Sequence, residues 1–240
     1  MTPARDAFDR ARASLLGMTL GEAVGMPSQT LTRAEIARCY GRIAGFVPPH
    51  DGHPVSHGLQ AGQVTDDTEQ SLLLARRLIA GPDHFDDLGW ANDSLEWERD
   101  IRARGLRDLL GPSSKAALEA LLAGVLPEDI GPAGTTNGGA MRIAPVGTSV
   151  KSHESVPAAF DLLHLNGGAV WPALPGTANI GDDTDTSGTI TGAMCGACAG
   201  MGALPEAAIV IMTKANELHE IDDIARALIA LRYRKTRAAF

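Results

Sequence analysis

Two short stretches of the chain combine threonine with aspartate, and each leads into an apolar run. Residues 64–68 read Val-Thr-Asp-Asp-Thr, and residues 179–186 read Asn-Ile-Gly-Asp-Asp-Thr-Asp-Thr. Carboxylates gathered beside apolar sequence are unfavourable unless a cation neutralises them, because burial and mutual repulsion both oppose their charge. Oxygen ligands without His or Cys suit hard cations, Mg²⁺ or Mn²⁺ and to a lesser degree Ca²⁺.

An alternative explanation is that both stretches only begin helices. Thr and Asp cap helix N-termini, and additional acids in the first turn complement the helix dipole. Two such clusters in one chain favour the metal, since two helix entrances that meet in space form one all-oxygen site. We therefore expect residues 64–68 and 179–186 to fold together around a hard cation.

Residues 134–142, Gly-Thr-Thr-Asn-Gly-Gly-Ala-Met-Arg, are a third stretch with unusual chemistry. Small residues let backbone N–H groups approach a ligand closely, while Asn137 and Arg142 add directional donors. The stretch lacks the lysine of a P-loop and the spacing of a dinucleotide fingerprint. It is either a ligand-binding segment or a glycine-rich connection.

Two further groups of polar residues have alternative interpretations. Glu22 lies among glycines spaced four apart, and it either faces the site or is a solvated residue at a helix end. His50, His53 and His57 have a spacing that binds a transition metal on a helix. The prolines and glycines around them predict instead an irregular loop that borders a cleft.

Apolar spacing predicts helices and no strand of useful length, so the expected fold is all-α. We expect a capping box of Thr32 and Glu35 at the start of the second helix, and Ser114 as the cap of the fifth. The expected helices cover residues 6–20, 30–40, 68–80, 85–104, 115–123, 155–163, 186–204, 205–217 and 222–231.

Composition excludes several classes of protein. The net charge of −8, without a long basic stripe, argues against a surface that binds duplex nucleic acid. The N-terminus lacks a hydrophobic signal core, which predicts a cytoplasmic protein. The uncharged stretch 186–204 is long enough to cross a bilayer. Its glycines at every fourth position predict that another backbone approaches closely, which occurs in membrane dimers and equally in a buried helix of a soluble bundle. No second apolar span exists, so we expect no membrane.

Four blocks, in this order, resemble the ADP-ribosylglycohydrolases, the family that includes the dinitrogenase reductase-activating glycohydrolase. The blocks are residues 21–27, 65–68, 137–147 and 181–186. The resemblance implies one all-helical domain over residues 1–240, with a central cleft that holds two Mg²⁺ ions or Mn²⁺ in their place. The implied metal ligands are Thr65, Asp66 and Asp67 from one cluster and Asp183, Asp185 and Thr186 from the other.

The resemblance also implies a reaction, the hydrolysis of the glycosidic bond between ADP-ribose, or a related ribosyl group, and its conjugate. The partner is then an ADP-ribosylated protein or a small ribosyl compound. Such a metal pair orients a diol and lowers the pKa of bound water, while carboxylates stabilise an oxocarbenium-like transition state. The implied substrate-binding residues are Asn137, Gly138, Gly139, Met141 and Arg142.

A carboxylate outside the metal ligands is expected to act as general acid or base. Asp108 is the first candidate, because its surroundings resemble the family's Asp-Ile-Gly segment, and Glu22 and Glu35 are the reserves. The chain departs from the family pattern in reading Asp-Leu-Leu-Gly at 108–111 and in having Glu at 22 where the family has Asp. The interval from Val146 to Asp183 is also short, as though a helical hairpin were missing around 149–152.

Two other functions fit the same residues. One is an N-glycosidase that acts on free nucleosides or other small ribosyl compounds. The other is a catalytically inactive protein that binds ADP-ribose or a nucleotide, which the shortened middle of the chain favours.

Overall fold

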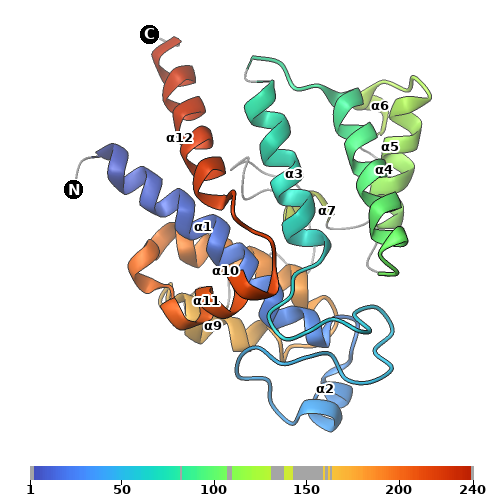
Figure 1. The fold of residues 1–240 in the computed structure, drawn as a ribbon, viewed down its shortest axis with the longest axis vertical. Coiled ribbons are helices and arrows are strands. Elements are labelled where there is room, and N and C mark those ends of the chain that lie inside the picture. The colour runs from blue at the N-terminus through green and yellow to red at the C-terminus, as the bar shows by residue number, and fades with distance from the viewer. Residues whose placement is uncertain are drawn as a thin grey trace.

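The structure is a computed structural model that describes residues 3–81, 83–106, 110–130, 138–142 and 164–238, together with Ala159 and Leu162. These residues contain helices and no strand, apart from an isolated bridge between Leu31 and Asp182, so the all-α prediction is confirmed. Figure 1 shows the helices, which are α1 (Pro3–Gly25), η1 (Met26–Ser28), α2 (Arg33–Tyr40), α3 (Asp66–Ala80), α4 (Asp87–Ala103), α5 (Pro112–Leu122), α6 (Pro127–Ile130), α7 (Gly138–Met141), α9 (Val170–Thr177), α10 (Thr184–Ala199), η3 (Met201–Ala203), α11 (Glu206–Ala215) and α12 (Ile221–Ala238).

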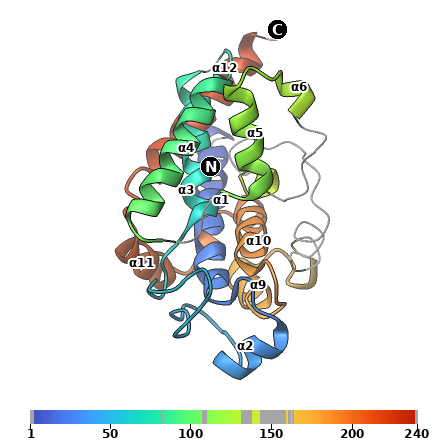
Figure 2. The same ribbon diagram turned by 90° about the vertical axis from the view of Figure 1, so that its right-hand side faces the viewer.

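Helices α1 and α10 lie side by side through the middle of the molecule, as Figure 2 shows, and share its most extensive interface. Glycines spaced four apart line this interface on both helices. A Cβ placed on Gly21 would overlap the carbonyl oxygen of Gly188, and one on Gly188 would overlap that of Gly21. The predicted close approach of another backbone is therefore confirmed, and it fixes where the two helices stand relative to each other.

Helix α10 carries no charge after Asp185, and it lies in the interior of the protein. Most of its residues from Thr184 to Gly196 are buried, chiefly against α1 and α9. Among the described helices, none has both the length and the apolarity that a membrane crossing requires.

The largest apolar core gathers around α1 and includes residues of α9, α11 and α12, among them the fully buried Met18 and Leu174. The sequence did not predict α9, because its prolines indicate a loop. Pro172 stands in the first turn, where a missing N–H is harmless, and Pro175 lies inside the helix. Burial of the apolar face of α9 outweighs the helix-breaking tendency of Pro175.

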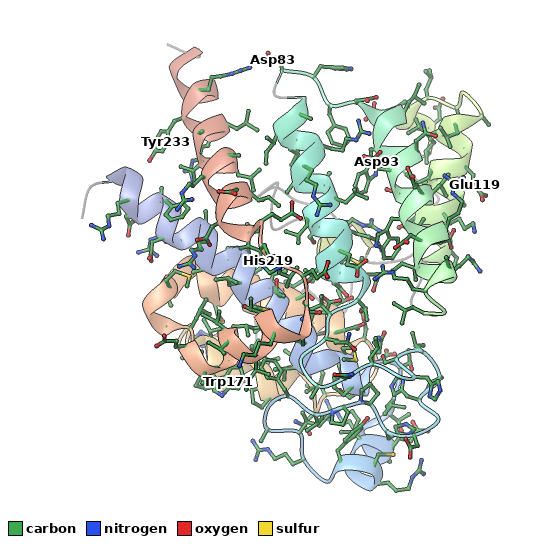
Figure 3. All side chains as sticks on the ribbon, viewed as in Figure 1. Asp83, Asp93, Glu119, Trp171, His219 and Tyr233 are labelled. Atoms are coloured by element: carbon green, nitrogen blue, oxygen red, sulfur yellow. The ribbon has the colours of Figure 1, made fainter. Side chains whose placement is uncertain are left out.

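Helices α4 and α5 pack against each other around a separate apolar cluster, on the side of α3 opposite α12 (Figure 1). Polar and charged side chains join α4 and its N-cap to α3. Arg77 on α3 donates to Asp86 (Nη1–Oδ2 3.1 Å) and to Asp93 (Nη2–Oδ1 2.7 Å), and Figure 3 shows Asp93 between α3 and α4. Trp97 Nε1 also donates to Glu69 on α3, at 2.6 Å.

Two predicted helix starts have different outcomes. The capping box of α2 is confirmed, since the Glu35 amide donates to the Thr32 hydroxyl (3.3 Å) and the Thr32 amide donates to Glu35 (2.8 Å). The predicted cap at Ser114 is wrong, because α5 begins at Pro112 with Gly111 as its N-cap. Proline's fixed φ suits the first helical position, and Ser114 lies inside the helix. The helix predicted at 155–163 lies almost entirely outside the described residues.

The segment between α2 and α3 is an irregular loop, as predicted, and one of its histidines is buried in it. His53 is 1% exposed, and its Nδ1 accepts hydrogen bonds from the amides of Ser56 (2.9 Å) and Val55 (3.3 Å). A ring nitrogen that accepts these bonds carries no proton. Burial, together with the neighbouring His50, lowers the pKa of His53 to about 4.

Replacing His53 with asparagine, whose side-chain oxygen can still accept from the loop amides, is expected to remove a pH dependence from the stability. The unfolded chain binds a proton at the ordinary pKa of 6.5, whereas the folded protein keeps His53 neutral down to about pH 4. Wild-type stability therefore falls by roughly 2 kcal/mol between pH 7 and pH 5, because the unfolded state binds the proton first.

Urea unfolding near pH 7 and near pH 5 measures this difference. His57→Gln, at an exposed position of the same loop, should keep the wild-type pH dependence. The same pH dependence in wild type and His53→Asn would contradict the prediction.

Candidate metal centre

Glu22 joins α1 to the first turn of α3. Its carboxylate accepts hydrogen bonds from the Thr65 amide (2.7 Å), the Thr65 hydroxyl (2.9 Å) and the Thr68 amide (3.0 Å). The first amides of a helix have no partner within the helix, so a carboxylate there satisfies them and complements the helix dipole. Glu22 thus caps α3 from another helix, a role that the Thr65 side chain does not perform.

The environment of Glu22 changes its protonation. The side chain is fully buried, and this burial raises the pKa of Glu22 to about 7, although the bonds from Thr68 and Thr65 favour the charged form. A cation beside Glu22 would return it to the carboxylate form. Two alternatives were predicted for Glu22, a solvated residue or one that faces the site. The solvated alternative is wrong, because the side chain is buried.

Asp66 and Asp67 stand in the first turn of α3, and both are buried. Oxygen atoms of Glu22, Asp66 and Asp67 all lie within 4.8 Å of one another. Three buried acids at this separation repel one another and lose hydration, so an opposite charge among them stabilises the arrangement. The donors are all oxygen, the set that Mg²⁺ and Mn²⁺ prefer, so these residues fit a hard divalent cation.

The first turn of α10 brings the second Thr/Asp cluster to the same place. Asp185 and Thr186 are 3% and 4% exposed, and the Thr186 hydroxyl lies 3.5 Å from Asp67 Oδ2, within reach of a hydrogen bond. The Thr186 amide donates to Asp185 Oδ1 at 2.9 Å. Asp183, just before the helix, is partly exposed. The two clusters therefore meet in space at Asp67 and Thr186.

Contacts of α10 with the end of α1 and with η1 hold this meeting point. The Thr184 hydroxyl donates to the Gly25 carbonyl oxygen at 2.8 Å, and the Ser28 hydroxyl donates to Thr184 Oγ1 at 3.1 Å. Asp182, in the bridge with Leu31, has a φ of 68°, a left-handed conformation that is uncommon for aspartate. The backbone before α10 is thus fixed on both sides of the acidic cluster.

A polar network connects α3 to the segment 138–142. Gln70 Nε2 donates to Asp66 Oδ2 (3.2 Å), while Gln70 Oε1 accepts from Arg142 Nε (2.7 Å). Arg142 Nη2 donates to the Ser114 hydroxyl on α5 (3.2 Å). Burial lowers the pKa of Arg142, and the charges of Asp66 and Asp67 act in the opposite direction.

The residues predicted to bind substrate lie beside this network. Gly138 is buried, and a Cβ there would stand 2.7 Å from the Ser114 hydroxyl, while Gly139 is exposed. The Met141 carbonyl accepts from the Ser71 hydroxyl at 3.2 Å, which ties the segment to α3. Asn137 lies outside the described residues.

The candidates for general acid or base are distributed differently. Glu22 belongs to the buried cluster, whereas the Glu35 carboxylate accepts from the amide (2.8 Å) and the hydroxyl (2.7 Å) of Thr32. Those bonds lower the pKa of Glu35, which favours a helix cap that stays ionised. Asp108 lies outside the described residues.

Two residues of the site were missed by the sequence analysis. Gln70 follows Asp66 by four positions, which places both on one face of a helix, so helical spacing is a signal that identifies it. Ser114 has no such signal, because its contact with Arg142 joins parts of the chain that are far apart in sequence.

A sequence model of the ADP-ribosylglycohydrolase family matches residues 3–154 and 147–238 of the chain. The two matched segments overlap at residues 147–154, within the interval that the sequence predicts to be shortened, and the shortening itself stays a prediction. The protein is 31% identical to ADP-ribosylarginine hydrolase Tri1 of Pseudomonas putida over 67% of this chain and 40% of the relative. It is 39% identical to ADP-ribosyl-[dinitrogen reductase] glycohydrolase of Rhodospirillum rubrum over 30% of this chain and 23% of the relative.

The chain spans about two fifths of the length of the first curated relatives that it matches. A solved structure titled ADP-ribosylglycohydrolase-related protein complex superimposes with a TM-score of 0.66, covering 95% of this chain and 99% of that one at 21% identity. That likeness supports the fold. Because the family model covers nearly the whole sequence, the chain belongs to the ADP-ribosylglycohydrolase family.

Proposed function

We propose that the protein hydrolyses the glycosidic bond between an ADP-ribosyl group, or a related ribosyl group, and its conjugate, using two divalent cations, Mg²⁺ or Mn²⁺. The observation that carries the proposal is the buried cluster of Glu22, Asp66 and Asp67, which meets the first turn of α10 at Thr186. Membership of a glycohydrolase family supports the reaction class.

The metal ligands proposed are the residues of both clusters, Thr65, Asp66, Asp67, Asp183, Asp185 and Thr186. When bound, the cations supply positive charge that orients ribose hydroxyls and lowers the pKa of a bound water. Glu22 positions this set, since its carboxylate holds the Thr65 hydroxyl and amide at the entrance of α3. The Thr186 hydroxyl lies against Asp67 and so fixes that carboxylate from the side of α10.

The remaining roles belong to residues near the cluster. We propose that the amides of Gly138 and Gly139, with Asn137, bind the phosphates of the substrate, because small residues admit close backbone contact. Asp108 is the proposed proton donor to the leaving group, as a carboxylic acid outside the metal ligands. Glu35 is the weaker candidate for the proton donor, because its carboxylate already accepts a hydrogen bond from Thr32 in the cap of α2.

The substrate proposed is an ADP-ribosylated protein side chain. The names of the relatives from Pseudomonas putida and Rhodospirillum rubrum refer to ADP-ribosylarginine and to ADP-ribosylated dinitrogen reductase. ADP-ribosyl-arginine is therefore the first compound to test.

Release of free ADP-ribose from ADP-ribosyl-arginine, followed by chromatography, tests the proposal. Chelator-treated protein should be inactive, and adding Mg²⁺ or Mn²⁺ should restore turnover. Cleavage of free nucleosides without cleavage of the ADP-ribosyl compound would replace this function by the nucleosidase. Binding of ADP-ribose without turnover on any conjugate would favour a binding protein.

A further inference from the structure

The guanidinium of Arg142 belongs to the polar network that connects α3 to the segment 138–142, next to the buried cluster of Glu22, Asp66 and Asp67. It donates from Nε to Gln70 and from Nη2 to Ser114, and attraction to Asp66 and Asp67 acts on its charge. Both donor contacts are made to other side chains of the protein. This cation is therefore engaged with α3 and α5 before any substrate arrives.

Gln70 transmits the position of Arg142 to Asp66. The amide of Gln70 is fully buried, so its two ends need different partners. Because Arg142 donates to Oε1, the NH₂ end of Gln70 is directed at Asp66 Oδ2, where it donates at 3.2 Å. Arg142 and the Asp66 carboxylate thus select the same orientation of the amide, and without Arg142 only the carboxylate opposes a flip that would place oxygen against it.

Arg142 also supplies charge where the fold buries several acids. Glu22, Asp66 and Asp67 lie within 4.8 Å of one another, and buried carboxylates without an opposite charge destabilise a fold strongly. A guanidinium stays protonated and remains a fixed positive charge. The segment that delivers it, 138–142, is itself held to α3 by the Ser71 hydroxyl at the Met141 carbonyl.

We propose that Arg142 is a positioning residue whose positive charge compensates Asp66 and Asp67 in the metal-free protein, as a bound cation would. Its role is this compensation and not the binding of substrate. The inference rests on the proposed metal role of these carboxylates. It implies that the positive charges of Arg142 and of the cation compensate the same negative charges, so each makes the other less necessary.

Thermal unfolding of the chelator-treated full chain tests the charge role directly. Arg142→Met keeps the length of the side chain and should lower Tm by roughly 5–10 °C, because a buried charge loses its partner. Arg142→Lys keeps the charge and should retain most of the wild-type Tm. Asp66→Asn, added to Arg142→Met, should recover at least half of the loss, whereas Asp66→Asn alone changes Tm little.

The double variant separates charge compensation from packing. If the two changes simply add, or if Arg142→Lys is as unstable as Arg142→Met, Arg142 is a packing residue and the proposal is overturned. If Arg142→Met does not fold without metal, folding of the Arg142→Met/Asp66→Asn protein supports the proposal, and its failure to fold refutes it.

Calorimetric titration with Mn²⁺ tests whether Arg142 and the cation compensate the same negative charges. Arg142→Met should bind Mn²⁺ with a Kd tighter by about threefold to tenfold, and Mn²⁺ should raise its Tm more than that of the wild type. Weaker Mn²⁺ binding by this variant would contradict the exchange of charges. The unfolding experiment needs neither metal nor substrate, so wild-type protein that binds no metal would refute the proposed function and leave the charge coupling measurable.

Discussion

Gly21→Ala is expected to destabilise the protein by more than about 4 kcal/mol. Little or no soluble folded protein is expected when the cells that express this variant are grown warm. The added methyl group would overlap the carbonyl of Gly188 across the α1–α10 interface, and the obstacle is backbone, which no side-chain rotation relieves. Separating the helices would also move Glu22, one residue further along α1, away from the first turn of α3.

Circular dichroism during heating, with soluble yield as a second measure, checks this expectation. Gly202→Ala is the matched control, because a Cβ at Gly202 meets nothing within 4 Å. That variant should stay within about 0.5 kcal/mol of the wild type. A Gly21→Ala protein with the wild-type Tm would show that the two helices do not pack through their glycines.

Asp67→Asn is expected to weaken divalent metal binding at least about a hundredfold, and to lower metal-dependent turnover at least as much. Asp67 is 1% exposed, lies within 4.8 Å of the Glu22 and Asp66 oxygens, and is within hydrogen-bonding reach of the Thr186 hydroxyl. Asparagine keeps the shape but removes the charge that a hard cation requires. The fold should survive, since the change relieves repulsion among buried acids.

Asp182→Asn is the matched control for this loss. It makes the same chemical change in the other acidic stretch, 179–186, but Asp182 is exposed, and asparagine tolerates its φ of 68° as well as aspartate does. Metal affinity and turnover should stay near wild type. Equal losses in the two variants would point to the combined negative charge of the two stretches rather than to a site around Asp67.

The all-α fold and the contact between the two acidic stretches could be predicted from local sequence. Apolar spacing identified most helices, and paired Thr/Asp clusters have an energetic reason to meet, because each alone places charge at a buried helix entrance. Glycines spaced four apart predicted a close backbone contact, and the structure shows α1 and α10 in that contact.

The contacts that cross between helices could not be predicted in the same way. Glu22 caps α3 from α1, and Arg142 reaches Gln70 and Ser114, so each role depends on where the fold places a distant segment. Helix α9 was missed because local proline signals conflict with tertiary burial, which decided the outcome. The predicted roles of Asp108 and Asn137 stay predictions, since both lie outside the described residues.

Calorimetric titration of chelator-treated protein with Mg²⁺ and Mn²⁺, with and without ADP-ribose, tests the central claim most directly. The proposed function predicts two ions bound per chain and ADP-ribose binding that appears only when the ions are present. Absence of metal binding, or equal binding of ADP-ribose with and without metal, would contradict a metal-dependent ADP-ribosyl hydrolase.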